Sequence, residues 1–131
     1  RRGHLLSFGN PHYVVPVDTL PQEWQELGQA LQEPAHRVLG TGGINVGFLE
    51  LKPNSEGVQT LRVFERGAGP TKSCGSGACA ASAVLEGVYG TPPPHRLHLT
   101  GGVLTIAREA EHFTLSGPAR LEYDGTWNIE T

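Results

Sequence analysis

Short runs of alternating or β-branched apolar residues recur along most of the chain, which is the pattern of half-buried β-strands. Residues 44–51 and 58–64 are the clearest pair, because the turn sequence Pro-Asn-Ser-Glu-Gly lies between them and predicts a hairpin. Glycine- or proline-containing segments separate most of the other runs. The predicted strands are residues 5–8, 13–17, 44–51, 58–64, 95–99, 103–108, 112–115 and 119–123.

Two segments have a helical pattern instead. In residues 21–31, Trp24, Leu27 and Leu31 fall on one face, so we expect an amphipathic helix on the surface. Residues 77–85 are small or apolar and carry no charge on any face, which is typical of a helix that is buried all round. In a chain made mostly of strands, such a helix belongs inside a curled sheet. We therefore predict a single domain over residues 1–131 with an α+β fold, a β-barrel of mostly antiparallel strands wrapped around a central buried helix.

Composition excludes several classes of protein. Hydrophobic residues make up 37% and charged residues 18% of the 131 residues, so the chain is neither disordered nor a coiled coil. The net charge of −3 argues against nucleic acid as a partner, and no apolar run approaches the roughly 20 residues of a membrane span. Because the chain lacks methionine and begins without a signal-peptide pattern, we expect a part of a longer protein that has no secretory leader here.

The least ordinary stretch is residues 65–77, a glycine-rich segment that joins a predicted strand to the uncharged helix and contains Cys74. The first N–H groups of a helix lack internal partners and the helix dipole is positive there, so an anion binds readily. We therefore expect Cys74 to be a reactive thiol with a lowered pKa. Cys79 lies one turn deeper among alanines and is predicted to be an inert small hydrophobe. A tight turn without a ligand is the ordinary alternative for this segment.

Polar residues on other turns and strands are the candidates to act with the cysteine, although each also has an ordinary structural role open to it. Two enzyme classes remain open from these residues alone. One is an acyl-transfer site with Cys74 as nucleophile and His12 as base, and the other uses the thiolate to remove a carbon-bound proton. The candidate residues are Asn10, His12, Asn45, Glu65 and Arg66.

No metal site and no cofactor are predicted. His95 and His98 are three residues apart in a predicted strand, so they point to opposite faces, and His36 is expected in a loop. The glycine pattern of a dinucleotide-binding fold is absent. Neither Lys52 nor Lys72 lies in an apolar segment suited to a Schiff base.

Four motifs, in order, resemble those of diaminopimelate epimerases: Gly-Asn-Pro-His at 9–12, Ile-Asn-Val-Gly-Phe at 44–48, Glu-Arg-Gly-Ala-Gly at 65–69 and Cys-Gly-Ser-Gly-Ala-Cys-Ala at 74–80. The resemblance covers essentially the whole chain and corresponds to the carboxy-terminal half of that family. It implies two related halves, each a β-barrel around a central helix, with the active site in the cleft between them. It also implies cofactor-independent interconversion of LL- and meso-diaminopimelate, for lysine and peptidoglycan precursors, in a bacterial cytoplasm.

The resemblance further implies a reaction with two cysteines, one from each half, which act as a thiolate–thiol pair on opposite faces of the substrate. Cys74 matches the second cysteine, and the first has no counterpart in this chain. The N–H groups of Gly75 and Ser76 would bind the substrate carboxylate. His12 and Glu65 would tune the cysteine pair as catalytic residues.

The same resemblance assigns binding of the other groups of the amino acid to Asn10, Asn45, Glu65 and Arg66. One departure from the family pattern is Pro70, which stands where glutamate is usual and removes a negative charge and a backbone donor from the loop. This departure concerns the affinity for substrate more than the reaction type.

The partners implied are a small amino-acid substrate and the missing amino-terminal half with its cysteine. Without that half we expect the chain to be inactive, and we expect its exposed cleft surface to allow self-association, as in a homodimer. Two alternatives stay open. One is a racemase of the same fold that acts on proline or hydroxyproline, and the other is a non-catalytic, ligand-binding relative.

Overall fold

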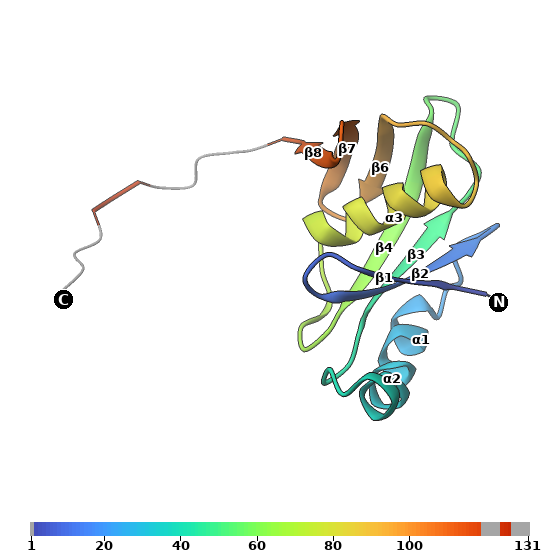
Figure 1. The fold of residues 1–131 in the computed structure, drawn as a ribbon, viewed down its shortest axis with the longest axis vertical. Helices are drawn as coiled ribbons and strands as arrows, with labels where there is room; N and C mark the ends of the chain where they lie inside the picture. Colours follow the sequence, from blue (N-terminus) through green and yellow to red (C-terminus); the bar gives the residue numbers. More distant parts are fainter. Residues whose placement is uncertain (1, 119–123, 127–131) are drawn as a thin grey trace.

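The computed structural model describes residues 2–118 and 124–126. In Figure 1, α3 lies in front of the strands, and α1 and α2 lie together at the other end of the domain. The elements in chain order are β1 (His4–Ser7), β2 (Pro11–Val17), α1 (Trp24–Ala30), α2 (Gln32–Leu39), β3 (Asn45–Glu50), β4 (Val58–Glu65), β5 (Gly69–Pro70), α3 (Gly75–Gly87), β6 (His95–Leu99), β7 (Gly102–Glu109) and β8 (His112–Ser116).

The strands of the described residues form one curled sheet in the order β1-β2-β3-β4-β6-β7-β8, with the short β5 paired to β4. β2 pairs with β3, and β4 with β6, in parallel, whereas the other pairings are antiparallel. A parallel pair needs a long crossover, and here α1 and α2 connect β2 to β3 while β5 and α3 connect β4 to β6. The predicted hairpin is confirmed as β3 and β4. The predicted strand at residues 119–123 lies outside the described residues.

The main core lies between α3 and the sheet. Ala78, Ala81 and Val84 of α3 are at most 1% exposed and pack against strand residues such as Leu61 and Leu97. This arrangement confirms the α+β fold in which a curled sheet encloses a helix of small residues. Small side chains are needed here because they let the helix approach the sheet closely on several sides.

The expectation that α3 is buried all round is wrong. Cys79 and Ala83 are only partly buried, and Gly75 and Gly87 at the helix ends are exposed. These residues recur at intervals of about one helical turn, so they form one open stripe along α3. The stripe is open because β1 and β8, the two edge strands, do not pair with each other within the described residues.

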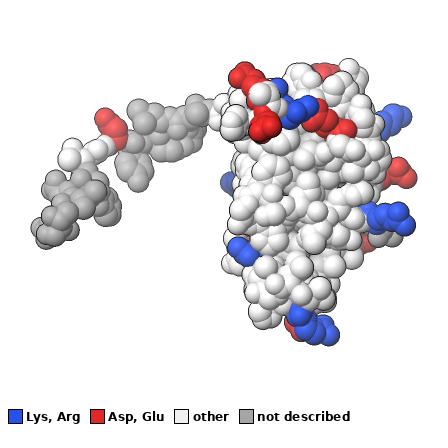
Figure 2. All heavy atoms as spheres, viewed as in Figure 1, with Lys and Arg blue, Asp and Glu red and all other residues white. Residues whose placement is uncertain are grey.

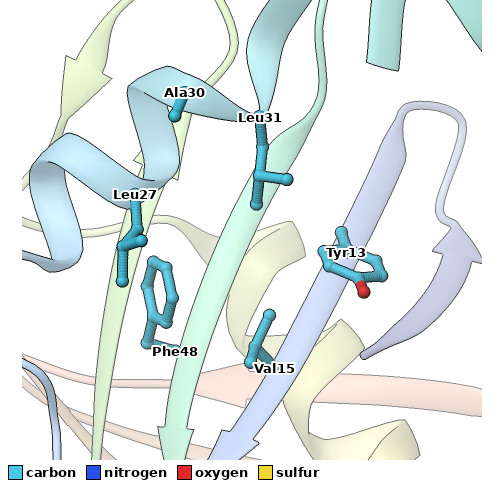
Figure 3. A pocket seen from close by; sticks show the side chains of 6 residues that line it. All are labelled: Tyr13, Val15, Leu27, Ala30, Leu31 and Phe48. Atoms are coloured by element: carbon cyan, nitrogen blue, oxygen red, sulfur yellow. The ribbon is translucent and has the colours of Figure 1, made fainter. Parts of the chain in front are cut away.

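A second hydrophobic cluster lies on the outer side of the sheet, where α1 and α2 cover β2, β3 and β4. Its buried residues include Val15, Val46 and Phe48, and Leu27 packs against them from α1. Gly28 allows the close approach of α1, because a Cβ atom at this position would lie 2.6 Å from the Phe64 ring. The cluster is not fully packed, since a pocket of about 240 Å³ remains. Figure 3 shows the residues that line it: Tyr13, Val15, Leu27, Ala30, Leu31 and Phe48.

The helical segment differs from the prediction in two ways. The expected helix over residues 21–31 is α1, which begins only at Trp24, and a further helix, α2, follows from Gln32 to Leu39. His36 therefore lies in a helix, not in a loop. Pro34 is tolerated in α2 because it occupies the first turn, where an N–H group has no partner within the helix. Gly40 ends α2 in the left-handed conformation, with φ of 68°.

The surface shows two general features. Among the described helices none is long and apolar enough to span a membrane, and the longest, α3, has 13 residues. Figure 2 shows that charged side chains of both signs lie mostly around the margin of the face that bears α3, while the middle of that face is largely uncharged.

A buried polar network ties α3 to β6. His95 is 3% exposed, its Nε2 bonds the carbonyl oxygen of Thr91 at 2.9 Å, and its Nδ1 lies 2.5 Å from Ser82 Oγ. Because a carbonyl only accepts, Nε2 carries the proton and Nδ1 accepts from the Ser82 hydroxyl. His98, three residues on, is exposed on the other face, as predicted.

Ser82→Ala is therefore expected to lower the free energy of unfolding by about 1–3 kcal/mol, because it leaves Nδ1 of His95 buried without a donor. Urea denaturation of the variant measures the loss, and His98→Ala, an exposed histidine of the same strand, is the matched control. Equal stability of the Ser82 variant and the wild type would show that the hydroxyl contributes nothing.

Candidate functional site

Cys74 lies where the sequence placed it, at the junction that leads into α3. It is the N-cap residue in an extended conformation, and its Sγ accepts a hydrogen bond from the Gly77 N–H at 3.4 Å. Its carbonyl oxygen accepts the next backbone bond, from Ala78 at 2.9 Å. A side chain at Gly77 would crowd this arrangement, since a Cβ there would lie 3.1 Å from both Cys74 Sγ and Val63 Cγ2. Gly77 thus allows the Cys74 sulfur to pack closely against the first turn of α3.

The expectation of a lowered pKa for Cys74 is wrong. The side chain is 8% exposed, and this burial raises the pKa of its thiol above the ordinary value. The Glu65 carboxylate raises it further, while hydrogen bonds from Gly77 and Ser76 lower it without compensating. The cost of removing water from a thiolate is therefore larger than the stabilisation that the helix N-terminus gives it, so the resting side chain of Cys74 is a thiol.

Titration of the chain is accordingly expected to show no Cys74 thiolate near neutral pH. The ultraviolet absorbance of thiolate, taken as the difference between wild type and Cys74→Ala, should rise only above the ordinary thiol pKa of 9.0. Burial also raises the pKa of Cys79, so the background from this second thiol stays low over the same range. A Cys74-dependent absorbance step near pH 7 would contradict the structure.

A chain of polar contacts leads from Cys74 to β2. Ser76 Oγ lies 3.8 Å from Cys74 Sγ and accepts a hydrogen bond from Asn10 Nδ2 at 3.4 Å. Asn10 Oδ1 is 3.0 Å from His12 Nε2, which places the imidazole proton on that nitrogen. His12 is 2% exposed, and this burial lowers the pKa of its imidazole. The charge of Glu65 raises the pKa and that of Arg66 lowers it, but burial is the largest effect. The imidazole is therefore neutral near neutral pH.

Asn45 lies beside His12, because the two residues are partners in the parallel pairing of β3 with β2. Its Nδ2 donates to the carbonyl oxygen of Pro11 at 3.0 Å, and its Oδ1 accepts from the backbone N–H of Arg66 at 2.9 Å. The buried amide thus links β2 to the end of β4. Part of its hydrogen-bonding capacity already serves the protein backbone.

Glu65 and Arg66 stand at the end of β4, where the chain turns into β5. The negative charge of Glu65 raises the pKa of both the His12 imidazole and the Cys74 thiol. Arg66 is exposed, and its Nη1 donates to the carbonyl oxygen of Thr41 at 2.8 Å. Pro70, in β5, pairs with Phe64 of β4 and is exposed. Hydrogen bonds and strand pairing thus link Cys74, Ser76, Asn10, His12, Asn45 and Arg66, and Gly75 is exposed beside Ser76 in the first turn of α3.

Sequence reasoning missed an apolar side of the site. Phe8, in the turn after β1, packs edge-on against the rings of both His12 and Phe113. Leu115, two residues after Phe113 on β8, lies beside Gly75, where a Cβ atom would be 3.2 Å from its Cδ1. The alternation of Phe113 and Leu115 marked one apolar face of this strand, but only the fold shows that it faces the start of α3.

The described residues contain no cluster of three or more histidine, cysteine or acidic side chains arranged to hold a metal ion. That the protein needs no cofactor stays a prediction.

Comparison with known proteins identifies the family. The model of the family "Diaminopimelate epimerase" matches residues 4–121. A diaminopimelate epimerase of Xylella fastidiosa (strain M12) is 42% identical over 125 residues, which are 93% of this chain. One of Xanthomonas oryzae pv. oryzae (strain MAFF 311018) is 41% identical over 128 residues, or 94% of the chain. The chain belongs to the diaminopimelate epimerase family.

This member of the diaminopimelate epimerase family spans 42–43% of the length of those two relatives. Among solved structures it resembles a phenazine biosynthesis PhzC/PhzF protein from Clostridium difficile (strain 630), with a TM-score of 0.58 and 19% identity over 79% of the chain and 36% of that protein. A PhzF-family protein from Enterococcus faecalis gives a TM-score of 0.57 at 20% identity, with the same coverage. At this identity the likeness establishes the fold alone.

Proposed function

We propose that the protein containing this chain is a cofactor-independent amino-acid epimerase that interconverts LL- and meso-diaminopimelate in a bacterial cytoplasm. The observation that carries the proposal is the chain of polar contacts from Cys74, at the start of α3, through Ser76 and Asn10 to His12, in a chain of the diaminopimelate epimerase family. The charge of Glu65 acts on the pKa of both Cys74 and His12. A thiol, a neutral imidazole and a carboxylate in one place suit the movement of a proton at carbon.

The start of α3 is the proposed site for the substrate α-carboxylate. The N–H groups of Gly75 and Ser76 lie in the first turn of the helix, which contains no acidic residue to repel an anion. Asn10 Nδ2 donates a hydrogen bond to the Ser76 hydroxyl. Arg66 and Asn45, at the other end of the polar chain, are proposed to bind the remaining polar groups of the amino acid.

Proton transfer at the α-carbon is proposed to use Cys74 on one face and a second cysteine, from the rest of the protein, on the other. In one direction the second cysteine, as a thiolate, takes the α-proton, and Cys74 gives its S–H proton to the carbanion and becomes a thiolate. In the reverse direction the two roles exchange, so protons balance. The raised pKa of Cys74 suits the donor role in the resting enzyme. Nearby dipoles and charges must stabilise the carbanion.

Two further proposals concern the partners. The missing part of the protein is proposed to close the site over Cys74, which excludes water and strengthens the helix-end electrostatics. A homodimer is proposed as the assembled form, because the face of α3 left open by the sheet is largely uncharged.

The test is a substrate panel with the complete protein. We expect conversion of LL-diaminopimelate to the meso form, and no turnover of proline or hydroxyproline. Racemisation of proline instead would retain the mechanism but change the substrate. Hydrolysis of an ester or peptide without epimerisation would overturn the proposal in favour of acyl transfer, and binding of diaminopimelate without turnover would leave only a ligand-binding protein.

A further inference from the structure

Phe8 has an unusual position in the fold. It lies in the turn between β1 and β2, and its backbone N–H donates to the carbonyl oxygen of Asn10 at 3.1 Å. Its ring centroid is 6.4 Å from that of His12 and 5.7 Å from that of Phe113, with the ring planes at 78° and 67°. Both contacts are edge-to-face, the geometry that aromatic pairs favour.

The contact between Phe8 and Phe113 joins two parts of the sheet that no backbone hydrogen bond connects in the described residues. Phe8 follows β1 and Phe113 belongs to β8, and these are the two edge strands of the curled sheet. α3 contacts both strands. The two rings therefore bridge the gap between the sheet edges beside the start of α3, where Leu115 lies next to Gly75.

This closure covers His12. The imidazole is 2% exposed although the turn beside it lies at the surface, where Phe8 itself is 37% exposed. Asn10 occupies Nε2, and the Phe8 ring stands against the imidazole. A shift of the imidazole would pull on Asn10, which in turn holds the Ser76 hydroxyl next to Cys74.

We propose that Phe8, held by Phe113, is a positioning residue for the reaction, which fixes the orientation of the His12 imidazole and keeps water away from it. The proposal rests on the proposed function for its effect on turnover, but the state of the imidazole is a separate property of the fold. The charged groups that act on the pKa of His12 are Glu65 and Arg66, and a substitution of Phe8 removes neither of them.

The test uses Phe8→Ala in the complete protein, with nitrogen-labelled histidine followed by NMR. His12→Gln assigns the His12 signals among those of the other histidines. Removal of the ring lets water reach the imidazole, so its titration midpoint should move up toward the ordinary pKa of histidine, because burial is the main cause of its lowering. Turnover of diaminopimelate should fall about ten- to a hundredfold, as expected for a misplaced catalytic group.

Three further variants make the test specific. Phe8→Leu keeps an apolar cover and should restore the midpoint of the wild type. Phe113→Ala should move the midpoint in the same direction as Phe8→Ala, and it carries the test if the Phe8 variant does not fold. The double variant should have no larger effect than Phe8→Ala, because both changes break one contact. Tyr89→Ala, which removes a 44% exposed ring beyond the other end of α3, should change nothing.

An unchanged His12 midpoint in folded Phe8→Ala, or in Phe113→Ala if the former does not fold, would overturn the proposal, and so would a shift of the same size in Tyr89→Ala. If the complete protein does not epimerise diaminopimelate, the proposed function fails while the NMR titration still decides whether Phe8 and Phe113 protect His12.

Discussion

Cys74→Ala in the complete protein is expected to abolish the interconversion of LL- and meso-diaminopimelate, with turnover at least about a thousandfold below wild type. Alanine has no exchangeable proton, so one face of the substrate loses its donor while every other group of the site remains. The fold should persist, since Cys74 lies at the edge of the core, as the N-cap of α3. Conversion of the pure LL isomer, followed by chiral separation of the products, measures the loss.

Cys79→Ala is the matched control, because it removes the other thiol of the same helix. This side chain is partly buried, next to alanines, so little volume is lost and stability should fall by no more than about 1 kcal/mol. Turnover should stay close to that of the wild type. If the Cys74 variant kept turnover within about tenfold of wild type, Cys74 would not be the proton donor.

The second large effect concerns the chain by itself, which we expect to fold but not to epimerise any amino acid. The chain has its own core between α3 and the curled sheet. Its only other cysteine, Cys79, is on the same helix as Cys74 and cannot reach the opposite face of a substrate bound at the start of that helix. The open site also leaves the substrate in water, where the electrostatic attraction of the helix end is weak.

Racemisation assays on the purified chain test this expectation, and circular dichroism shows whether the chain is folded. Addition of the missing part of the protein as a separate chain should restore turnover, and a cysteine-to-alanine variant of that part should not. Turnover by the folded chain alone would contradict the two-cysteine mechanism.

Much of the fold was predictable because local patterns and global architecture agree. Residues 77–85 carry no charge, and such a helix has few places other than the inside of a curled sheet. The hairpin of β3 and β4 followed from alternation and a turn sequence. The position of Cys74 at the helix start followed in the same way, from a glycine-rich segment between a strand and a helix.

The features that could not be predicted from the sequence depend mainly on contacts between residues that are distant in the chain. The helix α2 contains Pro34, which discourages helix prediction although the first turn tolerates it. The pKa of Cys74 rises because the fold buries the sulfur, and burial is not visible in a motif that predicts only the helix end. The Phe8–Phe113 contact joins residues that are 105 positions apart, so no local pattern announces it.

Isotope exchange tests the central claim most directly, that Cys74 and a second cysteine act on opposite faces of the α-carbon. The complete protein is given LL-diaminopimelate in deuterium oxide, and the product and the remaining substrate are separated early in the reaction. If one cysteine removes the α-proton as a thiolate and the other donates a solvent-exchanged deuteron, the meso product carries deuterium at the inverted α-carbon and the remaining substrate still carries protium. Product that retains the original protium would show a single base that returns the same proton, and would contradict the account.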